Sequence, residues 1–145
     1  MRKISFIVIA GMLFLCSCST PKIANTIWCT VSSATNGDKE GLIIESLYFK
    51  EGGQLDIIRS IASESGMEVS PYKYAGGTYE TIGSLKKNAP IVLTASTLRG
   101  DSVRYMGFVD VKKHILALYD SADSTVTTYL KNSNVVIKEY KDEKK

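Results

Sequence analysis

The stretch Thr26-Ile27-Trp28-Cys29-Thr30-Val31-Ser32 decides the fold class of this chain. Ile27, Cys29 and Val31 alternate along it with Trp28, Thr30 and Ser32. A period of two places alternate side chains on opposite faces of an extended strand, so the stretch predicts a β-strand. The Asn36-Gly37-Asp38 sequence that follows favours positive φ angles and therefore predicts a turn.

The same organisation continues to the end of the chain. Further short β-type segments, separated by turn residues, are predicted at 42–50, 55–61, 67–74, 78–82, 91–98, 103–109, 114–119, 125–130 and 135–137. The Gly76-Gly77 pair is expected to break the chain between two of these segments. The segment 54–65 also fits one face of a helix with Gly66 as its stop, but the flanking hairpin signals favour a strand.

These segments predict an all-β domain over residues 26–138, followed by a charged tail at 139–145. Roughly eight to ten strands joined by hairpin-length turns indicate an antiparallel up-and-down meander. The meander forms either a small barrel or a barrel-like sandwich. Closure is the more attractive alternative because it removes exposed strand edges.

The N-terminus carries the features of an export signal. Arg2 and Lys3 precede an apolar run over 4–15 that is too short to span a bilayer. The sequence Leu15-Cys16-Ser17-Cys18 resembles the lipobox of bacterial lipoproteins, with a leucine three residues and a small residue one residue before the cysteine. The resemblance implies that residues 1–17 are removed, that Cys18 is acylated, and that residues 18–25 tether the domain to a membrane.

Two alternatives to this lipid anchor are an ordinary signal peptide cut elsewhere and an uncleaved membrane anchor. The residues after Cys18 contain no acidic run. In the resembling lipoproteins an acidic run there often marks export to the cell surface. We therefore expect the chain on the periplasmic side of the outer membrane.

Charge and cysteine content exclude some classes of function. The net charge of +3 falls by two when Arg2 and Lys3 leave with the signal, and no block of like charge remains. Nucleic-acid binding would need a basic face, so no nucleic-acid partner is expected. Removal of Cys16 and acylation of Cys18 would leave Cys29 without a cysteine partner, which predicts a buried, unreactive thiol and no disulfide.

Several short motifs carry a resemblance to a family: Asn25-Thr26-Ile27-Trp28, Leu47-Tyr48-Phe49-Lys50-Glu51-Gly52-Gly53, Gly77-Thr78-Tyr79 and the segment 105–109. Together they resemble small lipocalin-like lipoproteins common in anaerobic Gram-negative bacteria. Lipocalins proper have Gly-x-Trp where this chain has Thr26-Ile27-Trp28. The resemblance implies a small antiparallel barrel but little about function, because many of these proteins have none assigned.

The resemblance also implies a structural role for the single tryptophan. In such proteins it plugs one end of the barrel, often under an arginine, and Arg59 and Arg104 are the candidates for stacking on Trp28. The alternative is a Trp28 that packs in the core while both arginines lie on the surface. Either role is structural.

Tyrosines provide the candidate ligand site. Tyr72 and Tyr74 share a strand face, Tyr79 follows a turn later, and Tyr48 and Tyr105 lie on other strands. At one mouth of a barrel they would form an aromatic rim suited to a small apolar ligand or a glycan. The alternative is that tyrosines are simply good strand formers.

No catalytic or metal-binding constellation emerges from the sequence. His114 is the only histidine, and Asp110, Asp120 and Asp123 lie near turns, which attract aspartate in any case. We therefore expect no enzyme, no cofactor and no metal. Two functions stay open. A hollow apolar interior would favour a ligand-binding module. A barrel filled with side chains would favour a structural or interaction protein acting through its loops, such as an envelope assembly accessory or a hydrolase inhibitor.

Overall fold

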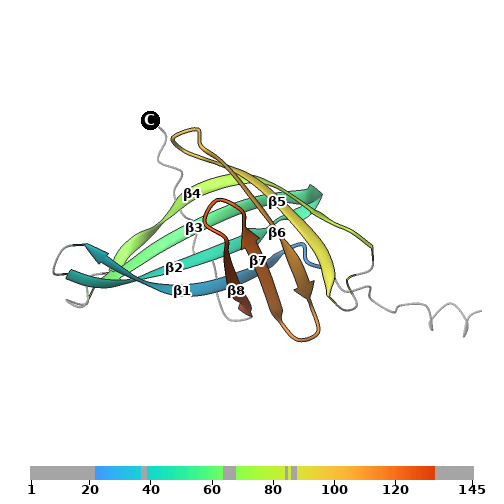
Figure 1. Cartoon of the computed structure of the whole chain (residues 1–145), viewed down its shortest axis with the longest axis horizontal. Helices are drawn as coiled ribbons and strands as arrows, with labels where there is room; N and C mark the ends of the chain where they lie inside the picture. Colours follow the sequence, from blue (N-terminus) through green and yellow to red (C-terminus); the bar gives the residue numbers. More distant parts are fainter. Residues whose placement is uncertain (1–21, 37–38, 64–67, 84, 86–87, 133–145) are drawn as a thin grey trace, which may run out of the picture.

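The protein is an eight-stranded closed antiparallel barrel in which each strand pairs with the next and β8 pairs with β1 (Figure 1). The computed structural model describes residues 22–36, 39–63, 68–83, 85 and 88–132. The all-β, up-and-down prediction is confirmed, and the barrel is the correct alternative. The architecture is consistent with a lipocalin-like barrel. The export signal, Cys18, the segment 135–137 and the tail lie outside the described residues.

The eight strands follow the chain in simple order. Their bounds are β1 (Thr26–Asn36), β2 (Lys39–Phe49), β3 (Gln54–Ser63), β4 (Glu68–Thr81), β5 (Ala89–Thr97), β6 (Ser102–Asp110), β7 (Ile115–Asp120) and β8 (Thr125–Asn132). A short 3-10 turn, η1 (Glu51–Gly53), joins β2 to β3, and Gly52 and Gly53 adopt the left-handed φ angles that glycine tolerates. The helical alternative for the segment 54–65 is wrong, because β3 is paired on both sides.

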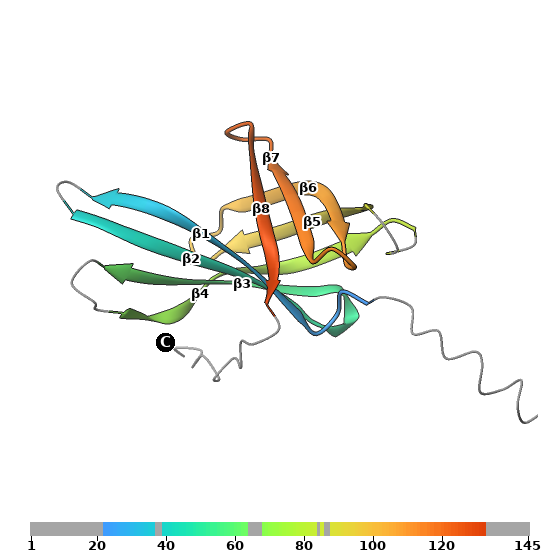
Figure 2. The same cartoon turned by 90° about the horizontal axis from the view of Figure 1, so that it is seen from below.

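The first four strands extend beyond the barrel. β1 pairs with β2 along its whole length but with β8 only at Ile27, Trp28 and Cys29. β4 pairs with β3 along most of its length but with β5 only from Ala75 onward. The distal halves of β1–β4 therefore project as a four-stranded sheet, called here the tongue, made of residues 30–36, 39–45, 59–63 and 68–74 (Figure 2).

The expected break at Gly76-Gly77 is wrong, since β4 runs through both residues. A β-carbon at Gly77 would lie 1.9 Å from the carbonyl oxygen of Thr94 on β5. Glycine is needed here because the backbones of β4 and β5 approach closely, and not because the chain turns. The predicted segments 67–74 and 78–82 are therefore parts of one strand.

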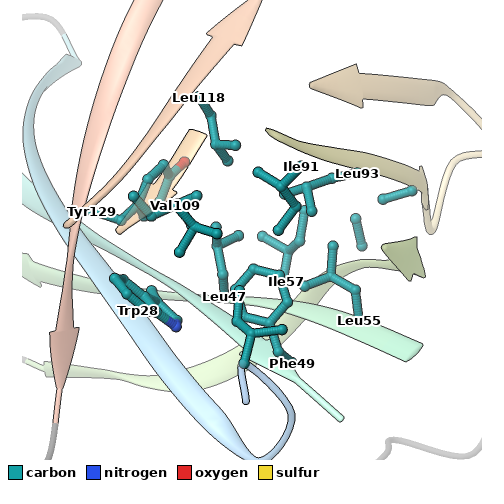
Figure 3. Close-up of a cluster of buried hydrophobic side chains, with 14 of the residues drawn as sticks. Trp28, Leu47, Phe49, Leu55, Ile57, Ile91, Leu93, Val109, Leu118 and Tyr129 are labelled. Atoms are coloured by element: carbon teal, nitrogen blue, oxygen red, sulfur yellow. The ribbon is translucent and has the colours of Figure 1, made fainter. Parts of the chain in front are cut away.

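Inward-facing apolar side chains pack together inside the barrel beside Trp28 (Figure 3). The largest fully buried members are Trp28, Phe49, Leu47, Leu55, Ile57, Ile91, Leu93, Leu116, Leu118 and Val109. Each such side chain contributes about 1.5–3 kcal/mol when it is fully buried. The indole N–H of Trp28 donates to the Thr26 hydroxyl at 2.8 Å, which supplies the partner that a buried tryptophan needs.

We call the end of the barrel that contains Trp28, Phe49, Leu55 and Tyr79 the packed end. The chain itself covers this end, because Ile23 is buried in the core cluster and the Asn25 amide donates to the Phe49 carbonyl at 2.6 Å. The packed end is therefore closed by residues that precede β1.

Cys29 differs from its prediction. It is half-buried, because Trp28 occupies the inner face of β1 and the face of Cys29 and Val31 points outward. Its thiol is free and lies 3.3 Å from the Ser46 hydroxyl. Within the described part of the chain, no helix has the length and apolar character required to cross a bilayer.

Candidate ligand site at the barrel mouth

Five inward-facing side chains from five strands meet where the barrel opens onto the tongue. This mouth cluster consists of Glu45 on β2, Arg59 on β3, Tyr74 on β4, Tyr105 on β6 and Tyr129 on β8. Strand alternation explains its position. Glu45 and Arg59 are cross-strand partners, two residues beyond the buried pair formed by Leu47 and Ile57 on the same inner face.

Glu45 links two other members of the mouth cluster, Arg59 and Tyr129, through hydrogen bonds. One carboxylate oxygen accepts a hydrogen bond from Arg59 Nε at 2.6 Å, and the other accepts from the Tyr129 hydroxyl at 2.7 Å. The side chain of Glu45 is 14% exposed and that of Arg59 is 26% exposed. Water therefore reaches the pair only in part, which strengthens its electrostatic interaction compared with a surface pair.

The Arg59 guanidinium stacks on an aromatic ring. Its Cζ lies 3.4 Å from the ring centre of Tyr74, a cation–π contact. Burial by itself lowers the pKa of Arg59, but the hydrogen bond and charge of Glu45, together with Tyr74 and Tyr72, outweigh this effect and raise it. The cation is thus held charged and oriented.

The two remaining tyrosines are held in their neutral, proton-donating form. Burial, assisted by the charges of Glu45 and Asp120, raises the pKa of Tyr105 to about 12. Burial and the neighbouring Glu45 also raise the pKa of Tyr129, whose side chain is almost fully buried. At neutral pH both phenols therefore keep their protons: Tyr129 donates its own to Glu45, and Tyr105 can act as a hydrogen-bond donor.

The tongue continues the inner face with apolar side chains. Ile43 and Ile61 are half-buried cross-strand partners located two residues beyond Glu45 and Arg59. Tyr72, the cross-strand partner of Arg59, is 41% exposed. The mouth cluster thus lies between the buried barrel core and a partly exposed apolar strip. Such a surface can contact a small molecule that has both polar and apolar groups.

The three tyrosines singled out in the sequence do not lie together. Tyr72 and Tyr74 lie at the mouth, beside Arg59. Tyr79 lies at the packed end, where its ring contacts Phe49 edge-on at 4.9 Å and its hydroxyl donates to the Lys50 carbonyl at 2.9 Å. Because β4 is continuous, the seven residues from Tyr72 to Tyr79 span about 20 Å and separate them.

The two arginines also differ from their expected placement. Arg59 stacks on Tyr74 rather than on Trp28, because it lies on the inner face at the other end of the barrel interior. Arg104 is exposed near the start of β6. Tyr105, named among the tyrosines that could converge, does lie in the mouth cluster, whereas Tyr48 lies beside Lys50 outside it. Sequence reasoning missed Glu45 and Tyr129. The available signal was a charge on the apolar face of a strand: Glu45 shares its face with Ile43, Leu47 and Phe49.

The turn aspartates perform local structural roles. Asp110 accepts from the Lys113 amide at 3.0 Å and Asp120 accepts from the Ala122 amide at 2.8 Å. Hydrogen bonds from Thr125 to the Asp123 carboxylate lower its pKa. His114 is exposed in the turn before β7 with a φ of 60°. Among the residues that the structure describes, no group of three or more His, Cys, Asp or Glu side chains could hold a metal ion.

The fold and the mouth cluster define a closed antiparallel barrel that carries a tyrosine-rich, charged cluster on its inner face beside the tongue. Comparison of the chain with protein-family models, with curated proteins and with solved structures found no match. The site itself is therefore the basis for the function proposed next.

Proposed function

We propose that this protein binds a small glycan at the mouth cluster. The observation that carries the proposal is the Glu45–Arg59 pair, which lies on the inner face of the barrel and is supported by Tyr129 and the ring of Tyr74. Carboxylate, guanidinium and phenol groups can exchange several hydrogen bonds with sugar hydroxyls. The partly exposed Tyr72 offers an aromatic face to the apolar side of a sugar ring.

A glycan fits this surface better than a purely apolar ligand does. Trp28, Leu47, Ile57 and Leu93 occupy the barrel interior beneath the cluster and are at most 1% exposed. An apolar ligand entering from the mouth would have to pass the Glu45–Arg59 pair and displace its hydration. The strip formed by Ile43, Ile61 and Tyr72 offers partly exposed apolar contacts on the inner face. A ligand with hydroxyl groups avoids the cost of dehydrating the Glu45–Arg59 pair, because its hydroxyls can replace the water.

Binding to an array of immobilised neutral and acidic oligosaccharides tests the proposal, followed by calorimetry with any sugar that binds. Tyr74→Ala is expected to weaken binding by about 1–3 kcal/mol, the order expected for losing one apolar contact surface. Tyr119→Ala is the matched control, because Tyr119 is 40% exposed on the outer face of β7. Equal losses in both variants, or an array without any binder, would contradict the proposal.

The proposed location is the periplasmic face of the outer membrane, with the chain anchored through lipid on Cys18. The support is the lipobox-like sequence Leu15-Cys16-Ser17-Cys18 after a basic and an apolar segment. Cys18→Ser is expected to release the protein from membranes in cell fractionation. Retention of that variant, or cleavage of the wild-type protein by protease added to intact cells, would count against the anchor or its orientation respectively.

A second candidate function, interaction with a protein partner, is favoured by the outer edge of β1. In the described part of the chain no strand pairs with this edge beyond Cys29, and the sequence Thr30-Val31-Ser32-Ser33-Ala34-Thr35 contains no charge. Charged residues and proline normally protect an exposed edge. The other free edge of the tongue, on β4, has such protection in Pro71 and Lys73. If a partner protein binds this edge, Ser33→Lys should abolish its chemical cross-linking to the barrel.

A further inference from the structure

The outer face of β6, β7 and β8 is apolar and exposed. Six large side chains on this face are between 40% and 66% exposed: Met106, Phe108, Ile115, Tyr119, Val126 and Leu130. The two outward residues between them, Ala117 and Thr128, are also uncharged. We call this face the apolar wall.

Strand pairing makes the apolar wall continuous. Tyr119 lies between Met106 and Val126 in adjacent strands, and Ile115 is the cross-strand partner of Leu130. Exposed apolar side chains scattered singly need no explanation, whereas a contiguous group of them marks an interaction surface. The outer face of antiparallel strands in a barrel is ordinarily polar, because it faces water.

The opposite side of the barrel has a different outer face. There, Asp56 on β3 is only 4% exposed and forms ion pairs with Lys50 and with Lys73, the latter at 2.9 Å. The ammonium of Lys50 also lies 5.8 Å from the ring centre of Tyr48. Large exposed apolar groups therefore concentrate on one side of the barrel, and this asymmetry indicates that one side has a preferred neighbour.

The N-terminal segment enters the barrel beside one end of the apolar wall. Leu130 pairs with Cys29 on one side and with Ile115 on the other, and residues 22–25 lead directly into β1. The eight residues from 18 to 25 can span less than about 30 Å even when fully extended. An anchor at Cys18 would therefore hold this end of the wall near the membrane.

Exposed basic side chains lie at the end of the wall beside the N-terminal segment. Lys112, Lys113 and His114 are exposed in the turn that precedes Ile115, and the Lys131 amide donates to the His114 carbonyl at 3.1 Å. The far end of the wall carries Asp120 at the end of β7, Asp123 in the turn that follows, and the exposed Arg104 on the outer face of β6. Basic side chains next to an apolar surface match the headgroups and acyl boundary of an anionic bilayer.

We propose that the apolar wall rests on the anionic lipid surface to which the chain is anchored. The inference rests on the membrane anchor proposed above but not on the glycan site. Phe108 and Leu130, close to the basic end, lie among the lipid headgroups, while Lys112 and Lys113 contact their phosphates. The tongue projects away from the start of β1, to which the tethered segment leads (Figure 2).

Tryptophan quenching tests the contact. The full chain, purified from its host, is incorporated into vesicles of phosphatidylcholine and phosphatidylglycerol with brominated acyl chains. Leu130→Trp places an indole on the wall, and Leu42→Trp is the matched control, because Leu42 is 48% exposed on the outer face of the tongue. The native Trp28 is fully buried and gives a constant background. We expect the indole at position 130 to lose most of its emission and the indole at position 42 to keep it.

Charge reversal at Lys112 and Lys113 tests whether these basic residues contribute to the lipid contact. Lys112→Glu combined with Lys113→Glu should reduce the quenching at position 130, as should vesicles without phosphatidylglycerol. If Leu130→Trp does not fold, Ile115→Trp reports the same part of the wall. The inference is overturned if the chain floats with the vesicles while neither wall indole is quenched, an outcome that leaves the anchor intact. Concentration-dependent dimers or a cross-linked protein at position 130, without quenching, would assign the wall to a protein neighbour instead.

Discussion

The packed end and the mouth of the barrel are built from the same strands but use their inner positions differently. At the packed end the inner residues of β2 and β3 are Phe49, Leu47, Leu55 and Ile57, all at most 1% exposed. Two residues nearer the tongue on each strand, the inner positions carry the opposite charges of Glu45 and Arg59. The fold therefore gains its stability from one end, and the other end is free to carry groups that serve a ligand.

The largest expected effect concerns the packed end. Trp28→Ala should lower the free energy of unfolding by about 3–5 kcal/mol, because it leaves a large cavity at the covered end of the barrel. Urea denaturation followed by far-ultraviolet circular dichroism measures the loss. Val126→Ala, at a residue 66% exposed, should change stability by no more than about 0.5 kcal/mol. If Trp28→Ala cannot be purified folded, Trp28→Phe should show a smaller loss in the same assay.

The next effect tests the close approach of β4 and β5. Gly77→Ala should destabilise the barrel by about 1–3 kcal/mol, because the new methyl group would meet the backbone of β5. Gly76→Ala is the matched control: its methyl group would meet the flexible end of Lys73, 2.9 Å from Cε, which can move. Equal unfolding midpoints for the two variants would show that the glycine pair has no such role.

A smaller effect is expected at the mouth. Tyr129→Phe removes the hydroxyl that donates to Glu45 and should cost about 0.5–1.5 kcal/mol, because the carboxylate keeps Arg59 and water can reach it in part. A double-mutant cycle with Glu45→Gln, measured by urea denaturation, isolates the interaction. A loss as large as that of Trp28→Ala would contradict the distinction between the two ends.

The smallest effect is the dependence of stability on pH that the mouth tyrosines cause, which should appear only in alkaline solution. The folded pKa of Tyr105 is raised to about 12, so its contribution is fully present below the ordinary pKa of about 10 and is lost as the pH rises through 12. Tyr129, whose pKa is raised in the same direction, adds to this loss. Absorbance of tyrosinate at alkaline pH should show a late step that Tyr105→Phe diminishes. Titration of all tyrosines in one step near pH 10 would contradict the raised pKa values of the mouth tyrosines.

The sequence predicted the strands well because most of them obey a local rule. Alternation in Thr26–Ser32 correctly placed Trp28 on the face opposite Cys29, although it did not reveal which face was inside. The Gly76-Gly77 pair was misinterpreted because a glycine pair usually marks a turn, whereas here it serves the close contact with β5. That contact joins residues far apart in the chain and has no local signature.

The mouth cluster was predictable only in part for the same reason. Tyr74 was identified from its residue type, but Glu45 and Tyr129 are 84 residues apart and meet only because β8 closes on β1. The charge of Glu45 on the otherwise apolar face of β2 is a signal that can be read from the local sequence. Its pairing with Arg59 depends on the register of β2 and β3, which the turn between them sets.

Trp28 has a practical consequence for spectroscopy. It is the only tryptophan in the chain, and its indole is fully buried beside Thr26. Its intrinsic fluorescence therefore reports the unfolding of one end of the barrel and is insensitive to events at the other. A sugar that binds beside Arg59 should leave the emission maximum unchanged, so titrations that rely on this signal would record a genuine ligand as silent.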